Sequence, residues 1–202
     1  MQHKKKIKDY FESIAPTYTK YSKKGFRKWL RLREEIVIKQ SFKTLLLGDV
    51  LELGSGAGYY SRCIYKQGCN SFTCVDFSSE MLNNLNIPGC IKINANIENF
   101  KSKKCFDTIF CAGALEFLER PEKVFNNVAK MLKPNGFFII LIPRYSFFGM
   151  IYQMFHQFHG FKIKLFKKND LQNWIQKANL DIVEYKTVSF FSIFLKLSPR
   201  KK

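Results

Sequence analysis

The sequence predicts an α/β domain in which a mostly parallel sheet of seven strands carries helices on both faces and ends in an antiparallel hairpin. Three observations support this class. Strand-like and helix-like segments alternate between residues 49 and 142, a glycine turn follows the first strand, and the last two strand-like runs are two residues apart. The expected strands are 49–53, 72–76, 90–94, 106–111, 136–142, 181–188 and 190–197.

Helix-like segments fill the spaces between these strands. They span residues 58–67, 79–86, 121–133 and about 168–178, and the third begins at Pro121 and closes with turn residues at 133–136. Ahead of the first strand, residues 4–20 and 24–43 show two amphipathic helical patterns broken near Gly25. An aromatic segment at 145–161 interrupts the alternation. We therefore expect a single domain, 1–202, with an N-terminal helical cap.

Composition limits the class of protein. The chain has 202 residues, of which 46% are hydrophobic and 25% charged, as in ordinary globular domains. No apolar run approaches the ~20 residues of a membrane-spanning helix, and no apolar signal segment follows the charged start, so we expect a cytoplasmic protein. The six cysteines form no C-x-x-C pair, which favours reduced core thiols and no metal site.

The formal net charge of +18 has two explanations. A charge of this size indicates an anionic partner, such as nucleic acid, acidic lipid or an anionic small molecule. The excess is mostly lysine, however, and asparagine, isoleucine and phenylalanine are abundant too, which the codon usage of an AT-rich genome would also produce. Lysines cluster at 4–8, 101–104 and 162–168. Both explanations stay open.

The most informative stretch is Val50–Tyr60, which has the pattern of a short apolar strand, a tight turn and the start of a helix. The alternating glycines of Gly54–Gly58 allow a sharp turn and leave room for a ligand against the backbone. Backbone N–H groups are expected to converge there, beside a positive helix N-terminus. A dinucleotide-binding turn would place glycine at position 59, which is tyrosine, and Glu52 would repel a pyrophosphate. The pattern favours a zwitterion that carries an amine.

Four segments, taken in their order and spacing, resemble the class I S-adenosylmethionine-dependent methyltransferases over about residues 45–145. They are Leu51–Gly58, Val75–Leu82, Asn94–Phe100 and Phe106–Cys111, the last followed by Ala114–Leu118 and Leu132–Gly136. The resemblance implies a Rossmann-like cofactor-binding core at 45–144. It places a helical cap or lid at 1–44 and a substrate-side lid with the C-terminal strands at 145–202. It also implies S-adenosylmethionine as the cofactor and methylation of a small molecule as the reaction.

The same resemblance assigns roles to the matched residues. Asp76, at the carboxyl end of its strand, is expected to accept both ribose hydroxyls, and Glu52 with the glycine turn to receive the amino-acid end. Phe77 and Met81 would enclose the adenine. Asn96 stands where the family usually has an aspartate, but its amide oxygen can still accept from the adenine amino group. The expected cofactor set is Glu52, Gly54, Gly56, Gly58, Asp76, Phe77, Met81, Asn96, Ile97 and Cys111.

The catalytic base is not evident from the sequence. The family often has histidine where this chain has Phe117, so a base must come from elsewhere or the acceptor must already be ionised. The main task of such an enzyme is to hold the acceptor in line with the methyl carbon. The candidate bases are Tyr18, Tyr21, His156 and His159.

Two flanking segments suggest the kind of acceptor. Residues 10–18 are similar to the lid helix of small-molecule methyltransferases of quinone and tetrapyrrole biosynthesis, and residues 143–161 are expected to form the opposite wall. Arg144 and Lys162 would give that aromatic wall a basic rim, which suits an amphipathic anionic acceptor. The same composition is typical of a helix resting on an anionic membrane. A nucleic-acid methyltransferase and a non-catalytic methyltransferase-like subunit stay open as alternatives, and no obligate protein partner is evident.

Overall fold

The computed structural model describes residues 2–21, 25–43 and 45–201. Seven strands form one mixed sheet in the order β3-β2-β1-β4-β5-β7-β6. The pairs among β1 to β5 are parallel, whereas β7 runs antiparallel to β5 and β6. The strands are β1 Asp49–Leu53, β2 Ser71–Asp76, β3 Ile91–Asn94, β4 Phe106–Ala112, β5 Leu132–Pro143, β6 Leu180–Thr187 and β7 Ser192–Pro199. The predicted fold class is confirmed.

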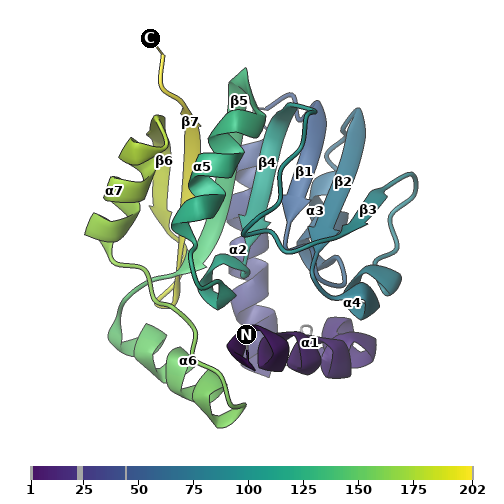
Figure 1. The fold of residues 1–202 in the computed structure, drawn as a ribbon, viewed down its shortest axis with the longest axis vertical. Coiled ribbons are helices and arrows are strands. Elements are labelled where there is room, and N and C mark those ends of the chain that lie inside the picture. Colours follow the sequence, from purple (N-terminus) through teal and green to yellow (C-terminus); the bar gives the residue numbers. More distant parts are fainter. Residues whose placement is uncertain (1, 22–24, 44, 202) are drawn as a thin grey trace.

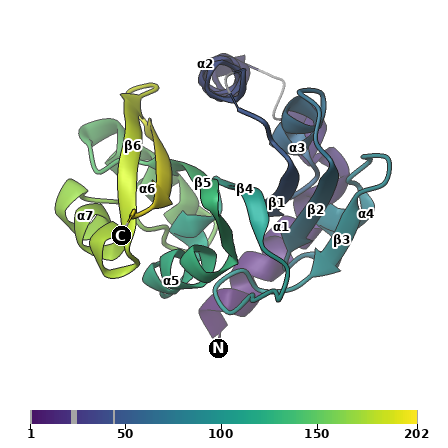
Figure 2. The ribbon, with the colours of Figure 1, turned by 90° about the horizontal axis from the view of Figure 1, so that it is seen from above.

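Helices cover both faces of the sheet and one end of it (Figure 1). The helices are α1 Gln2–Tyr21, α2 Gly25–Phe42, α3 Tyr59–Tyr65, α4 Ser79–Asn83, the 3-10 helix η1 Leu115–Phe117, α5 Glu122–Met131, α6 Phe147–Phe158 and α7 Lys168–Lys177. Seen from above, α2 and α3 lie on one face and α5 and α7 on the other (Figure 2). The helices α1 and α6 lie beyond the lower end of the strands in Figure 1.

The apolar strands explain why two layers of helices are needed. In β1, Val50 faces the core that α2 and α3 cover, and Leu51 faces the core that α5 and α7 cover, because successive side chains alternate across a strand. Both side chains are fully buried. Parallel strands with such continuous hydrophobic runs need cover on both faces. Among the described residues, no helix is both long and apolar enough to cross a membrane.

The strand β5 differs from expectation because it begins at Leu132 rather than at residue 136. Leu132 pairs with Phe106, and the next paired residues are Phe137 and Thr108. The turn residues 133–136, which we expected to close the preceding helix, therefore form an irregularity inside β5. The parallel pairing begins before the turn is complete, so the apolar Leu132 enters the sheet.

Candidate functional site

A cavity opens at the carboxyl ends of the parallel strands, where open α/β sheets bind their ligands. Its walls come from the loops that follow β1, β2, β3 and β4, from α1, and from residues of α2, α3, α4 and η1. The lining residues are Lys4, Ile7, Phe11, Tyr18, Arg31, Gly54, Ser55, Gly56, Tyr59, Tyr60, Asp76, Phe77, Met81, Asn96, Ile97, Ala112, Gly113, Ala114, Phe117 and Leu118. Seven of the ten residues expected to bind the cofactor are among them.

Asp76 lies in the wall of this cavity in a fixed orientation. One carboxylate oxygen accepts from the backbone N–H of Gly56 at 2.8 Å, and the other accepts from that of Ser78 at 2.9 Å. Burial raises the pKa of Asp76 above its usual value, and these backbone hydrogen bonds act in the opposite direction. Ser78 also caps the helix α4 that follows, since its hydroxyl accepts from the backbone N–H of Met81 at 3.2 Å.

The glycine turn differs from the expected cluster of N–H donors. The N–H groups of Gly54 and Ser55 both donate to the carbonyl of Val75, at 2.7 and 3.2 Å. The N–H of Gly56 donates to Asp76, and that of Gly58 donates to the carbonyl of Ser55 at 3.0 Å. These four donors are engaged inside the fold and do not converge on the cavity. The turn therefore contributes shape to the site, and Asp76 contributes its charge.

Three expected cofactor residues lie outside the cavity lining. Glu52 points into the protein with only 2% of its surface exposed, and burial raises the pKa of its carboxyl to about 8. Cys111 is fully buried in the core, where burial raises the pKa of its thiol. Gly58 sits where an added Cβ would lie 3.2 Å from Leu85, so it serves helix packing. The sequence could not separate these residues from those that border the cavity.

The other cofactor residues border the cavity as expected. Phe77, Met81 and Ile97 supply apolar surface, and Met81 is 1% exposed. The amide oxygen of Asn96 accepts from the backbone N–H of Glu98 at 2.9 Å, which orients its side chain. The adenine-binding roles of these residues stay predictions.

The helix α1 covers the cavity and is fixed by ionic and aromatic contacts. Lys4 Nζ lies 2.6 Å from Glu98 and 3.2 Å from Glu119, so the start of α1 is tied to the loops after β3 and η1. Further along, the ring of Phe11 contacts Phe117 and Phe77, with centroids 5.0 and 6.1 Å apart. The similarity of residues 10–18 to a lid helix therefore fits their placement across the site.

Arg31 is a cavity residue that the sequence analysis missed. It projects from α2 over the rings of Tyr59 and Tyr60 and donates to the hydroxyls of Tyr60 and, at 3.3 Å, Tyr18. Tyr60 donates in turn to Glu34, whose pKa is raised by burial. The sequence does show Arg31 and Glu34 as opposite charges three residues apart on a helix, but the direction in which their side chains point depends on tertiary packing.

The candidate bases are separated by the structure. Tyr18 lines the cavity. His156 is buried in α6 behind Phe117, among aromatic rings, and His159 is exposed and packs against Tyr10 and Phe155, so neither lines the cavity. The side chain of Tyr21 lies outside the part of the chain that the structure describes in atomic detail.

The aromatic segment 143–161 does not form the opposite wall that we expected. None of its residues lines the cavity, and neither does Lys162; the segment packs behind Phe117 instead. The cations of the cavity lining are Lys4 and Arg31 rather than Arg144 and Lys162. Within the described ranges, no group of three or more His, Cys, Asp or Glu side chains could hold a metal ion.

Comparison with known proteins agrees with this geometry. Residues 51–140, which span β1 to β5, match the family model described as "Methyltransferase domain". This match covers slightly less than half of the chain and supports a class I S-adenosylmethionine-dependent methyltransferase domain. The predicted resemblance is thus confirmed, and the matched residues include the glycine turn, Asp76 and the loop after β4 that borders the cavity.

Individual relatives match the chain at low sequence identity. Malonyl-[acyl-carrier protein] O-methyltransferase 1 of Ilyobacter polytropus is 27% identical over 66% of this chain and 50% of its own length. Ubiquinone biosynthesis O-methyltransferase of Rickettsia canadensis is 29% identical over 46% of this chain and 41% of its own. The chain thus spans about half the length of these relatives. Magnesium protoporphyrin IX methyltransferase of Synechocystis, solved with bound SAM, shares the fold at 15% identity, covering 98% of each chain with a TM-score of 0.75.

Proposed function

We propose that this chain transfers a methyl group from S-adenosylmethionine to a small amphipathic or anionic molecule by in-line displacement. The observation that carries the proposal is Asp76, whose carboxylate lines the cavity and is oriented by two backbone N–H groups. Carboxylate oxygens have lone pairs for further donors, and the two ribose hydroxyls supply two. Space for the cofactor next to Asp76 is supported by Gly56, where an added Cβ would meet no atom within 4 Å.

In methyl transfer from S-adenosylmethionine, the main contribution of the protein is to position the two reactants. S-adenosylmethionine supplies a methyl carbon bonded to a positively charged sulfur, which leaves as a neutral thioether. The acceptor atom forms its bond to that carbon as the carbon–sulfur bond breaks, and any proton it carries passes to a base or to water. Alignment of the two reactants lowers the barrier by ~7–11 kcal/mol. Phe11, Phe117 and Leu118 offer the apolar wall that would hold an acceptor.

The polar groups beside this wall support an acceptor with a charged or strongly polar end. Arg31 lines the cavity and donates to the Tyr18 hydroxyl, which makes Tyr18 the proposed proton acceptor among the four candidates. By their names, the relatives described above are O-methyltransferases, one acting on malonyl-[acyl-carrier protein] and one working in ubiquinone biosynthesis. We propose the same class of acceptor here, with the protein working in the cytoplasm at a membrane surface.

Calorimetric titration with S-adenosylhomocysteine tests the cofactor assignment. We expect micromolar binding by the intact chain and a loss of about 100-fold in Asp76→Ala, because hydrogen bonds to a charged group contribute ~1.5–3 kcal/mol each. Asp76→Asn, which keeps the shape of the side chain, should bind with intermediate affinity. Asp170→Ala, at an exposed position of α7, is the matched control and should bind as the intact chain does. No binding by the intact chain would overturn the proposal.

Transfer of labelled methyl groups then separates the alternatives. Label recovered in a lipid extract, and lost in Asp76→Ala, supports the proposal. Label recovered in RNA, with binding that falls steeply as salt rises, would identify a nucleic-acid methyltransferase instead. Cofactor binding without transfer to any extract would identify a binding subunit.

A further inference from the structure

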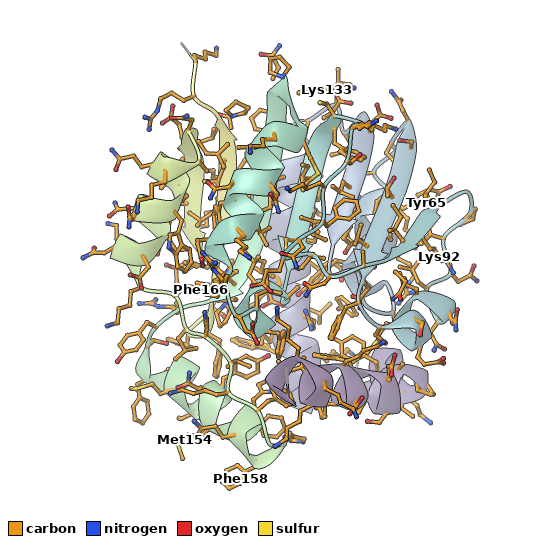
Figure 3. All side chains as sticks on the ribbon, viewed as in Figure 1. Tyr65, Lys92, Lys133, Met154, Phe158 and Phe166 are labelled. Atoms are coloured by element: carbon orange, nitrogen blue, oxygen red, sulfur yellow. The ribbon has the colours of Figure 1, made fainter. Side chains whose placement is uncertain are left out.

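The helix α6 presents an unusually apolar outer face. Phe147, Ile151, Met154 and Phe158 recur at helical spacing along one stripe, with exposed fractions of 69%, 47%, 56% and 86%. Phe148, Met150 and Phe155, also exposed, widen this stripe. Figure 3 shows Met154 and Phe158 pointing away from the body of the protein. We call the exposed residues 147, 148, 150, 151, 154, 155 and 158 the α6 face. Apolar surface gathered in this way marks an interaction site.

The inner side of α6 is packed, so the α6 face belongs to a fixed helix. His156 is buried against Tyr152, Phe161 and Phe117, with ring centroids 4.6, 5.3 and 5.6 Å apart. The Ser146 side chain caps the helix by accepting from the N–H of Gly149 at 3.1 Å. The apolar residues of the α6 face are therefore held outward by the fold itself.

The apolar surface continues beyond the helix. Phe190, in the turn between β6 and β7, is 64% exposed, and its ring centroid lies 5.3 Å from that of Phe148. The hydroxyl of Ser146 donates to the carbonyl of Phe190 at 3.1 Å, which ties this turn to the start of α6. Two segments that are distant in sequence thus contribute to one apolar surface.

In the sequence, the charged residues on both sides of α6 are positive. Between Glu122 and Asp170 the sequence contains no acidic residue, and α6 itself has neither acidic side chains nor lysine or arginine. The segment that follows α6 carries four exposed lysines, Lys162, Lys164, Lys167 and Lys168. An apolar helix face flanked by lysines is the pattern of proteins that lie in the interface of an anionic membrane.

We propose that the α6 face docks onto an anionic lipid bilayer. The charge pattern favours a bilayer over a second copy of the chain, because a twofold dimer through this face would bring two sets of lysines together. The docked helix would also lie next to the site. Its residue His156 and the following Phe161 pack on Phe117, which lines the cavity. On the proposed function, this places the cavity within reach of an acceptor dissolved in the membrane.

Sedimentation with vesicles tests the docking without any measurement of activity. The intact chain should pellet with vesicles of equal phosphatidylglycerol and phosphatidylcholine at 100 mM salt, and far less with pure phosphatidylcholine or at 500 mM salt. Met154→Ser with Phe158→Ser should reduce partitioning at least tenfold. Leu32→Ser with Ile36→Ser, two exposed apolar residues on α2, is the control pair and should leave partitioning unchanged.

The electrostatic contribution of the lysines to vesicle binding needs a variant of its own, because the Met154→Ser, Phe158→Ser pair tests only the apolar contribution. Lys162→Gln with Lys168→Gln should weaken binding to the anionic vesicles and reduce its dependence on salt. Binding of S-adenosylhomocysteine by each variant shows that its fold is intact. If the intact chain itself did not bind S-adenosylhomocysteine, that result would count against the proposed function and not against membrane docking. The docking proposal is overturned if the intact chain does not pellet with anionic vesicles at low salt, or if the α6 and α2 double variants lose vesicle binding equally. It is also overturned if the only effect of the α6 double variant is to convert a dimer into a monomer.

Discussion

Adding one methyl group at Gly54 or at Gly56 distinguishes the two roles of the glycine turn. Both residues have positive φ, +74° and +53°, so an alanine at either position costs ~1–2 kcal/mol in backbone conformation. Their surroundings differ. A Cβ at Gly54 would lie 2.3 Å from the Cβ of Ala114, whereas a Cβ at Gly56 would meet nothing within 4 Å.

This difference sets the expected magnitudes. Carbon atoms in contact are normally ~3.5–4.0 Å apart, and overpacking of this kind typically costs ~1–3 kcal/mol. Gly54→Ala should therefore lower the free energy of unfolding by about 2–5 kcal/mol, and Gly56→Ala by about 1–2 kcal/mol. Since the Gly56 methyl group would project into the cavity, that variant should lose affinity for S-adenosylhomocysteine while its fold is largely kept.

Urea unfolding and calorimetric titration together provide the assay. Ala114→Gly removes the partner of the clash, so the double variant with Gly54→Ala should regain about 1–3 kcal/mol relative to the sum of the two single changes. Ala114→Gly in the Gly56→Ala background should give no such recovery. The reasoning is refuted if Gly54→Ala and Gly56→Ala are equally destabilised, or if Ala114→Gly recovers neither or both.

Two further outcomes follow from local contacts. Ser78→Ala removes the N-cap of α4 and should lower the free energy of unfolding by ~1 kcal/mol, measured in urea; an unchanged midpoint would contradict the capping role. Burial raises the pKa of Glu52 from its ordinary 4.5 to about 8, so the stability present below pH 4.5 is lost as pH rises toward 8, by about 3 kcal/mol at pH 7. Glu52→Gln should flatten this decline in unfolding measured from pH 5 to 8, and an identical slope would show that another group titrates.

The succession of strands and helices along the chain and the position of the glycine turn were predictable, because each depends on local patterns. Alternating apolar segments, and Asp76 at the end of the second strand, place the site at the carboxyl edge of the sheet. Arg31 was missed because the direction of a helical side chain depends on how α2 packs across α3. The segment 143–161 was predicted as a cavity wall because composition reports that residues are aromatic and says nothing of which neighbour they meet.

The sequence also could not show which of two strand-end carboxylates would border the cavity. Glu52 and Asp76 are both acidic residues near the ends of neighbouring parallel strands, and the sequence offers no way to distinguish their surroundings. The structure buries Glu52 in the interior and leaves Asp76 in the cavity wall. A shift of two residues along the strand thus decides whether a carboxylate borders a ligand or the core.

The internal hydrogen bonds of the glycine turn have an entropic consequence. Because the N–H groups of Gly54, Ser55, Gly56 and Gly58 already have acceptors within the protein, the conformational entropy of ordering this loop is lost on folding. A ligand then meets a preorganised surface, and its binding need not be offset by ordering of the loop. Since these four N–H groups are not available to an anion, the turn offers a free phosphate few hydrogen bonds. A neutral sugar with two adjacent hydroxyls can instead donate to the aligned carboxylate of Asp76.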